Sequence, residues 1–232
     1  MQPSPEFSPV LAAKKLLREG RSGALATLMQ GSGDPYCSLV NVATAADGAP
    51  LVLISRLAVH TKNILADPRV SLMIDERKPG DPLQGARIML LGTAATTDEP
   101  DARRRYLERQ PEADMFAGFA DFAFYRVTLK GAHLVAGFGR IVDLKSSDIL
   151  TETADAAALL AAEPEIVAQI NAQSAQAMAH HAGGAHGGQW RCVGVDPEGL
   201  ELQNGRAALR VTFSQRIRTH EALHRAVRAL AG

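Results

Sequence analysis

One segment, from Leu51 to Leu72, brings hydroxyl, imidazole, ammonium and amide side chains together within a few residues. Its pattern is an apolar run, a polar turn, a short helical stretch and a second apolar run. Hydroxyl groups, a lysine and the free backbone N–H groups of a helix start are groups that bind phosphate. The pattern is also typical of a surface helix with a solvated lysine, so spacing alone leaves both interpretations open. The polar side chains of the segment are Ser55, Arg56, His60, Thr61, Lys62 and Asn63.

Histidines near the C-terminus form a second group with chemical potential. His180, His181 and His186 lie beside glycines, and His220 and His224 are four residues apart in an expected helix. Nearby imidazoles can hold a metal ion, and a single one can ligate haem iron. Because no carboxylate or cysteine completes a ligand set, we interpret both groups as exposed helix residues and expect no metal site.

Other reactive residues show no catalytic pattern. The chain lacks GxSxG, HExxH and Walker-loop motifs, so no catalytic residue is assigned. Cys37 and Cys192 lie far apart in apolar, strand-like runs and are interpreted as buried thiols. The charged run Asp98–Gln110 is interpreted as a solvated helix face rather than a nucleic-acid patch. The 25 basic residues of the chain balance 25 acidic ones, and no aromatic residues interleave with these arginines.

The elements that position the Ser55–Asn63 turn are short strands at hairpin spacing. No crossover helix separates them, which favours antiparallel pairing. Five to seven short strands with a few helices are typical of a small barrel. Ser8 and Pro9 predict the start of a first helix and Gly20 its end; further helices are expected over His60–Ala66 and Asp101–Gln110. The expected strands are Gly23–Met29, Tyr36–Ala43, Pro50–Ser55, Arg69–Asp75, Arg87–Ala95, Phe122–Lys130 and His133–Val135.

Composition shifts near Lys145, where Ser146–Asp148 is expected to be a linker. The fold class is therefore α+β: an N-terminal antiparallel split β-barrel over residues 8–145, then a small α+β domain over residues 150–232. Two helices (Thr151–Ala162 and Pro164–His181), three strands (Trp190–Val195, Leu200–Gln203 and Ala207–Phe213) and a last helix (Thr219–Leu230) are expected there.

The chain shows no sign of export or membrane insertion. Its N-terminus has no basic stretch followed by an apolar run, and no apolar run reaches the roughly 20 residues of a membrane helix. We therefore expect a cytoplasmic protein without membrane or nucleic-acid partners.

Several segments, taken in order, resemble the FMN-binding split-barrel superfamily of pyridoxamine 5′-phosphate oxidase. The branch most similar is the haem-utilisation proteins, in which the barrel precedes a C-terminal domain of unknown function. The similar segments are SGALATL (Ser22–Leu28), SRLAVHTKN (Ser55–Asn63), DPRVSL (Asp67–Leu72), RIMLLGTA (Arg87–Ala94), DFAFYRV (Asp121–Val127) and GFGR (Gly137–Arg140).

The resemblance implies roles for the residues of the turn and of two neighbouring strands. Ser55 corresponds to a hydroxyl at the end of the flavin-contacting strand, beside Arg56. The segment His60–Lys62 falls where the family grips the FMN phosphate, and Asn63 completes that turn. Arg87 begins a strand where the family places a side chain near the flavin ring. Ser38 lies on the neighbouring strand, where the oxidase itself has an arginine.

The function that the resemblance implies is that of an FMN-binding, oxidoreductase-like protein. Oxidation of pyridoxamine phosphate is not expected, because no equivalent of the oxidase's basic substrate-binding residues is found. Whether the chain is an enzyme stays open, an FMN-dependent oxidoreductase being the activity implied. The alternative is a haem-binding or haem-degrading protein, and a third is a barrel without cofactor that serves as an interaction module. Barrels of this family are homodimers with the cofactor at the subunit interface, so a homodimer is expected.

The C-terminal domain departs from its relatives at one stretch. Related domains carry a pattern like N-x-D-H-x-D, whereas this chain has Asn171, Gln173, Ser174 and Gln176. A titratable face has become neutral, which argues against a metal, proton-transfer or haem role of that face. The later stretch VGVDPEGLEL (Val193–Leu202) does fit the family.

Overall fold

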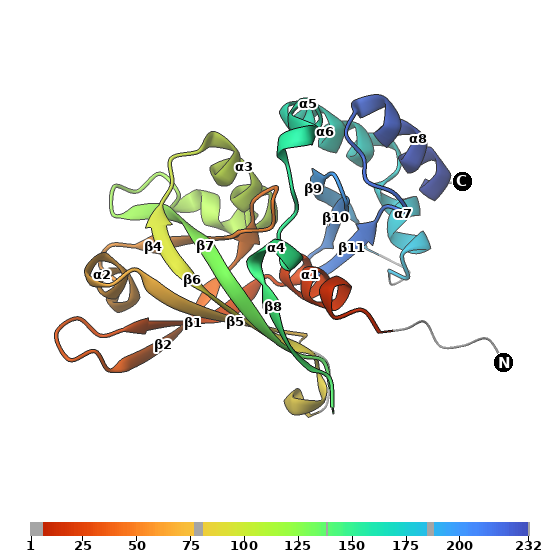
Figure 1. The fold of residues 1–232 in the computed structure, drawn as a ribbon. Helices are drawn as coiled ribbons and strands as arrows, with labels where there is room; N and C mark the ends of the chain where they lie inside the picture. Colours follow the sequence, from red (N-terminus) through yellow and green to blue (C-terminus); the bar gives the residue numbers. More distant parts are fainter. Residues whose placement is uncertain (1–6, 77–80, 138, 185–187, 232) are drawn as a thin grey trace.

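The computed structural model describes residues 7–76, 81–137, 139–184 and 188–231, and the structural statements below concern these residues. Figure 1 shows a large, curled sheet beside a smaller three-stranded sheet covered by helices. The predicted α+β class with an antiparallel split barrel is confirmed.

The large sheet runs in the order β2-β1-β5-β6-β7-β4-β3, with β8 also paired to β7, and its neighbouring strands are antiparallel. Alternate residues of β1 and β5 are buried, as a sheet with one face on a core requires. Within the described residues the sheet has eight strands rather than five to seven. They are β1 (Ser22–Leu28), β2 (Pro35–Asn41), β3 (Ala43–Thr44), β4 (Pro50–Ser55), β5 (Arg69–Asp75), β6 (Arg87–Thr96), β7 (Phe122–Val135) and β8 (Ile141–Lys145).

Strand β7 is continuous where two strands were expected. The break predicted at Gly131 is instead a bulge: Leu91 pairs with Gly131 and Gly92 with Leu129, which leaves Lys130 unpaired. Such an extra residue bends a strand without ending it, so the glycine marks curvature rather than a turn.

The helices of this part begin at the predicted signals. α1 (Pro9–Glu19) is capped by Ser8, whose Oγ accepts a hydrogen bond from Leu11 N at 3.4 Å, and ends at Gly20. α2 (Val59–Ala66) and α3 (Pro100–Arg109) follow, with short 3₁₀ turns at Pro82–Gln84 and Pro111–Met115. The expected linker Ser146–Asp148 is wrong, because it lies in α4 (Ser146–Ile149), which continues directly from β8. Asp148 fixes that start by accepting a hydrogen bond from Lys145 N at 2.9 Å.

The C-terminal part packs helices against a sheet of order β11-β10-β9. The helix expected over Pro164–His181 is divided at Ser174 into two. Its elements are a 3₁₀ turn (Ala154–Ala156), α5 (Ala157–Ala161), α6 (Glu163–Gln173), α7 (Ala175–His181), β9 (Arg191–Asp196), β10 (Gly199–Asn204), β11 (Ala207–Thr212) and α8 (His220–Ala231).

Apolar side chains form separate clusters on either side of residue 150. Two clusters fill the barrel and the space beneath α3, and a third lies wholly within residues 156–230. The domain boundaries drawn from the sequence stay a prediction, because the two parts also share the buried polar contacts described next.

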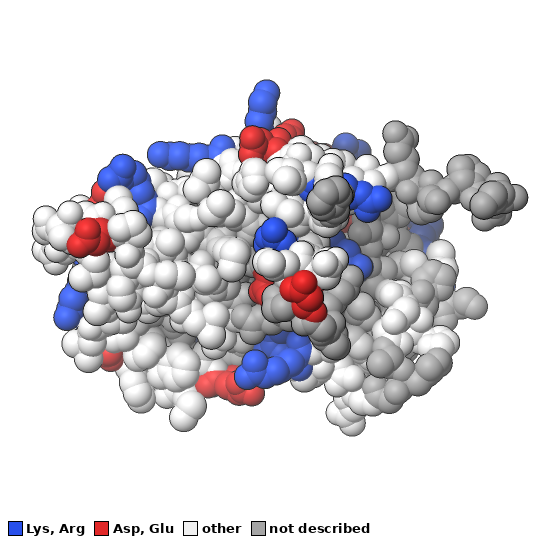
Figure 2. Space-filling model, turned by 90° about the horizontal axis from the view of Figure 1, so that it is seen from below, with Lys and Arg blue, Asp and Glu red and all other residues white. Residues whose placement is uncertain are grey.

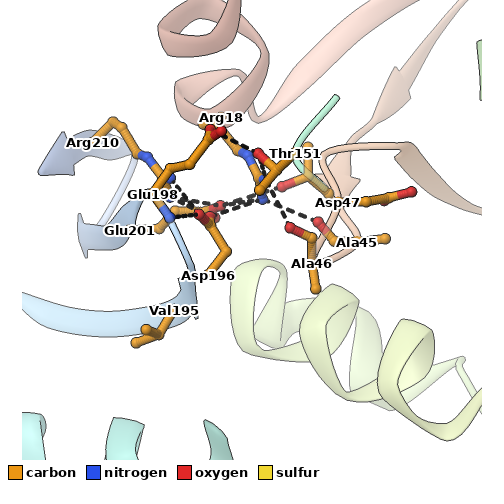
Figure 3. A network of polar contacts seen from close by, with 12 residues as sticks. Arg18, Ala45, Ala46, Asp47, Thr151, Val195, Asp196, Glu198, Glu201 and Arg210 are labelled. Atoms are coloured by element: carbon orange, nitrogen blue, oxygen red, sulfur yellow. Dashed lines mark hydrogen bonds and ion pairs between the residues drawn. The ribbon is translucent and has the colours of Figure 1, made fainter. Parts of the chain in front are cut away.

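A network of buried charges joins the two parts, where arginines of α1 and α3 meet carboxylates of the C-terminal part. Figure 3 shows the contacts of Arg18 in this network. Arg18 of α1 lies 3.2 Å from Glu201 and 3.3 Å from Asp196, and its other amino group donates to Ala46 O at 2.7 Å. Arg109 of α3 donates to Glu201 at 3.1 Å, and Arg105 pairs with Glu163. All of these ionic side chains are at most 4% exposed.

Two interpretations of the sequence are therefore corrected. The run Asp98–Gln110 is not simply a solvated face, since Arg105 and Arg109 are buried and ion-paired. Cys37 is not a buried thiol: it lies exposed on the outward face of the edge strand β2, whereas Cys192 is buried as predicted.

Among the described helices, none combines the length and apolar character needed to cross a membrane.

Candidate functional site

The predicted turn lies at the end of β4, where the chain turns into α2. Ser55 Oγ accepts a hydrogen bond from Leu57 N at 3.1 Å, and Ser55 O accepts one from Ala58 N at 3.1 Å. These two bonds make the turn compact and start α2 four residues after the strand ends. The local sequence thus places the start of α2 beside the end of β4.

The start of α2 is suited to an anion. Its N-cap, Ala58, offers no side-chain cap, and no acidic residue lies in the first turn. The first backbone N–H groups of the helix are thus not satisfied by a side chain and carry the positive end of the helix dipole. Lys62 is exposed one turn into the helix and makes no ion pair within the described residues.

Ser38 and His60 meet although they are 22 residues apart in sequence: Ser38 Oγ of β2 lies 3.0 Å from His60 Nδ1. The Ser38 hydroxyl is also 3.5 Å from Leu25 O, to which it can donate. A hydroxyl that donates to Leu25 can accept from Nδ1–H, which leaves His60 Nε2 unprotonated. Burial lowers the pKa of His60, which also favours the neutral ring.

Thr61 and Asn63 point into the protein rather than toward solvent. Asn63 Nδ2 donates to Thr27 Oγ1 at 3.0 Å, and its Oδ1 accepts from Gln30 N at 3.1 Å. Thr61 is fully buried. In this structure the amide of Asn63 holds α2 against the β1–β2 hairpin, so its predicted contact with a cofactor stays a prediction.

Asp121, just before β7, joins the site without having been assigned a role from the sequence. Its carboxylate accepts a hydrogen bond from Ser55 Oγ at 2.7 Å, and its backbone carbonyl accepts one from Arg56 N at 2.7 Å. The Arg56 side chain donates to Ala120 O. The DFAFYRV segment contained this residue, but only the pairing of β4 with β7 brings it to Ser55. A carboxylate here disfavours a phosphate bound directly on Ser55.

Arg87 is not brought to this turn within one chain. Ser55 pairs with Phe122 at one end of β7, whereas Arg87 pairs with Val135 at the other. These positions are thirteen residues apart along β7, up to about 43 Å at about 3.3 Å per residue. Arg87 instead donates to Leu83 O at 3.2 Å.

The outer face of the large sheet carries apolar side chains in two adjacent rows. The first row runs through Leu39, Ala24, Met73, Met89 and His133, and the second through Cys37, Ala26, Ser71, Leu91 and Gly131. The four large apolar residues of these rows are between 41% and 69% exposed. In Figure 2, a broad uncharged area fills the left half of the face seen from below, with charged residues gathered around its margin. An exposed apolar area across several strands is typical of an interaction surface.

Of the two predicted histidine groups, the structure describes the pair His220 and His224 in full and the other group in part. His220 and His224 lie together on α8 with ring centroids 4.4 Å apart. His186 and the side chain of His181 lie outside the described residues. Asn171 holds α6 against β9, because its amide donates to Cys192 O at 3.0 Å and accepts from Cys192 N at 2.6 Å.

A family model described as pyridoxamine 5′-phosphate oxidase matches residues 11–136, just over half of the chain. A curated relative, the chloroplastic non-canonical heme oxygenase HOZ of Arabidopsis thaliana, is 40% identical over 135 residues. That match covers 56% of this chain but only 41% of the relative, so the chain spans about two fifths of that protein's length.

Two solved structures match over nearly the whole chain. A protein of unknown function from Agrobacterium tumefaciens is 29% identical with a TM-score of 0.89, covering 99% of this chain and 97% of its own. A heme binding protein from Mycobacterium smegmatis is 27% identical with a TM-score of 0.59, covering 98% of each chain. The barrel and the C-terminal part thus occur together in other proteins.

Proposed function

We propose that this chain, which belongs to the pyridoxamine 5′-phosphate oxidase family as its sequence predicted, binds haem in its barrel, with FMN as the second candidate. The observation that carries the proposal is the half-buried His60, whose Nδ1 is held by Ser38. The curated relative named as a heme oxygenase and the structure named as a heme binding protein support the same cofactor.

The donor set at His60 fits a haem iron. Protein histidines that ligate metals use one neutral ring nitrogen and hold the other by a hydrogen bond, which fixes the tautomer and the ring orientation. Ser38 supplies that bond, and burial keeps the ring neutral by lowering its pKa. Haem, when bound, supplies redox chemistry at its iron, while the protein sets the ligand and the access to it. His60 would hold the iron through Nε2, and Ser38 would orient the ring.

Haem titration of the purified protein tests this proposal. A Soret band is expected on addition of haem, with at least tenfold weaker binding in His60→Ala. Ser38→Ala, which removes only the orienting hydroxyl, is expected to weaken binding less and to shift the band. His220→Ala, at an exposed histidine of α8 outside the barrel, serves as the control. Unchanged affinity and spectrum in His60→Ala would show that haem, if bound, is held elsewhere.

The uncapped start of α2 supports FMN as the second candidate. Backbone N–H groups and Lys62 there can bind a phosphate, as the resemblance implied. The carboxylate of Asp121 lies beside Ser55 and repels a phosphate there. For this reason we rank FMN below haem as the cofactor. A bound flavin would supply the redox chemistry, while α2 and Lys62 would fix its phosphate.

Flavin binding is tested by titration with FMN while its fluorescence is followed. Lys62→Ala is expected to weaken binding about tenfold, because one charged contact to the phosphate is lost. Lys130→Ala, at an exposed lysine of β7, is the control. Absence of binding at high micromolar FMN removes this candidate, and the absorption spectrum of the protein as isolated distinguishes flavin, haem and an empty barrel.

A homodimer formed through the outer face of the large sheet completes the proposal. A second chain packed on this face would bury its exposed apolar rows. Arg87 can reach a cofactor near Ser55 only from a second chain, since the two residues are far apart in one chain. Met73→Asp with Leu91→Asp is expected to convert a dimer into a monomer in light scattering. A monomeric wild-type protein would contradict the dimer and the predicted role of Arg87.

A further inference from the structure

A small cavity of about 110 Å³ lies between α6 and α8 in the C-terminal part. Its wall includes His220 and His224 from α8, opposite Gln169, Gln173 and Ser174 at the end of α6. The packing of α8 depends on Leu223, which is 2% exposed, rather than on the two histidines. His220 is exposed and His224 is half-buried, so neither has an evident role in the core.

The two imidazoles are placed as a pair of ligands would be. His220 and His224 lie one turn apart on the same helix face, and their ring centroids are 4.4 Å apart with planes inclined by 46°. Two imidazoles that bind one ion at right angles, through metal–nitrogen bonds of about 2.0–2.1 Å, have ring centroids about 4.5 Å apart. The observed separation of 4.4 Å therefore matches that of two rings on one ion, which is reached when the side chains of His220 and His224 turn a ring nitrogen toward it.

We propose that His220 and His224 bind a divalent transition-metal ion, Cu²⁺, Ni²⁺ or Zn²⁺, at the mouth of this cavity. Imidazole nitrogen favours these ions, whereas Mg²⁺ and Ca²⁺ require oxygen ligands and usually carboxylates, which do not line this cavity. The amide and hydroxyl oxygens of Gln173 and Ser174 are available as further neutral ligands.

The charge around the pair limits the strength of such a site. The described residues contain no group of three or more histidine, cysteine and acidic side chains placed to hold a metal, so the ion has two strong ligands and open positions. Arg228 also lines the cavity and repels a cation. The site is accordingly of moderate affinity, with exchangeable positions that a substrate or a further donor can occupy. It lies outside the barrel and does not rest on the function proposed there.

Titration of the tag-free protein with CuCl₂, NiCl₂ and ZnCl₂ in a calorimeter tests the proposal. One ion per chain is expected, with affinity in the order Cu²⁺ above Ni²⁺ and Zn²⁺. His220→Ala and His224→Ala are each expected to weaken Cu²⁺ binding about tenfold or more, because the chelating pair becomes a single ligand. Arg228→Gln is expected to strengthen binding by removing the repelling charge. His133→Ala is the control and leaves the affinity unchanged.

Electron paramagnetic resonance of the Cu²⁺ complex supplies a readout independent of affinity. Hyperfine structure from two nitrogen ligands is expected in the wild type and from at most one in either single variant. The proposal is overturned if the double variant His220→Ala, His224→Ala still binds one Cu²⁺ per chain with unchanged affinity, since the ion then sits on other histidines. It is equally overturned if the wild type binds no ion, or if Arg228→Gln has no effect on the affinity.

Discussion

Lys62 and Asn63 are adjacent in α2 but have opposite surroundings. We therefore expect substitution of Asn63 to lower stability and substitution of Lys62 to affect ligand binding. Asn63 is 1% exposed and bonds Thr27 and the backbone of Gln30, whereas Lys62 is exposed. Asn63→Ala leaves the buried Thr27 hydroxyl and the partly buried N–H of Gln30 without their partner, so we expect a loss of about 2 kcal/mol in the free energy of unfolding. Urea denaturation measures it.

Lys62→Ala is the matched control for that change. A surface substitution away from packed features is expected to alter the free energy of unfolding by less than about 0.5 kcal/mol. Equal destabilisation by the two substitutions would show that Asn63 does not hold α2 to the hairpin. Loss of ligand binding in Lys62→Ala without loss of stability would identify Lys62 as a binding residue.

The two thiols differ in reactivity because their surroundings differ. Burial raises the pKa of the Cys192 thiol to about 12, whereas Cys37 is exposed on the outer face of β2. The thiolate is the reactive form, so Cys192 stays unreactive at pH 8. In Cys37→Ser we expect no thiol to react with an aromatic disulfide reagent until denaturant is added. Rapid labelling of that native variant would mean that β9 opens readily.

Residue types and spacing could predict part of this site. The Ser55–Asn63 turn was found because strand, turn and helix follow each other along the chain. The roles of Asp121, Arg105 and Arg109 could not be assigned, because their hydrogen-bond partners lie between 58 and 92 residues away in the sequence. A local sequence does not show whether a charged side chain is paired or solvated. The meeting of Ser38 with His60 likewise depends on how α2 packs on β2.

At the scale of single elements, the bulge between β6 and β7 depends on Gly92. A Cβ at this position would lie 2.3 Å from Thr128 O, a backbone atom that cannot move independently of β7. We therefore expect Gly92→Ala to cost about 2–3 kcal/mol in the free energy of unfolding. Thermal and urea denaturation measure the loss.

Gly118 provides the control for that substitution, since a Cβ there meets no atom within 4 Å. Gly118→Ala is expected to change stability little or to raise it slightly by restricting the unfolded chain. If both variants were equally stable, the close approach of β6 to β7 would not be what requires glycine at residue 92.

Strands with a strong local sequence pattern were predicted well, whereas elements that depend on contacts with one neighbouring strand or residue were not. Strand β5 was expected over its observed range, because alternating apolar residues and a preceding Asp-Pro mark it. Within the part of the chain that the structure describes, strand β8 pairs only with β7, and most of its residues are at least partly exposed, so its apolar pattern is weak. Helix α4 is set by the backbone bond to Asp148, and the same serine-rich sequence is equally typical of a linker.

At the scale of the whole molecule, the buried charges make the barrel and the C-terminal part depend on each other. Arg18, Arg105 and Arg109 come from α1 and α3, and their carboxylate partners Glu163, Asp196 and Glu201 come from beyond residue 150. Removal of one member of a buried ionic group costs about 3–5 kcal/mol, because the remaining charges stay buried without compensation. A barrel expressed without the C-terminal part would lose these ion pairs and expose the three arginines to solvent.

Unfolding experiments on Glu201→Gln test this dependence. Arg109 and Arg18 lower the pKa of Glu201, and Arg18 and Arg210 lower that of Asp196, although burial alone would raise both. Carboxyl groups with lowered pKa stabilise the fold above their unfolded values of about 4, and this stabilisation is lost as pH falls through the lower folded values. The wild type is therefore expected to weaken steeply below about pH 4. Glu201→Gln should lose about 3–5 kcal/mol at pH 7 and show a smaller further loss in acid.

The single tryptophan makes the coupling itself measurable. Trp190 belongs to the apolar cluster of the C-terminal part, so its fluorescence reports on that part, while circular dichroism reports on both. If the charged junction couples them, the two signals follow one urea transition in the wild type and separate in Glu201→Gln, where one part loses its support first. Glu221→Gln, which breaks only the exposed pair with Arg225, is the control and should leave one transition at the wild-type midpoint. Two separate transitions in the wild type would instead mean that the parts fold independently and that the buried network contributes little to holding them together.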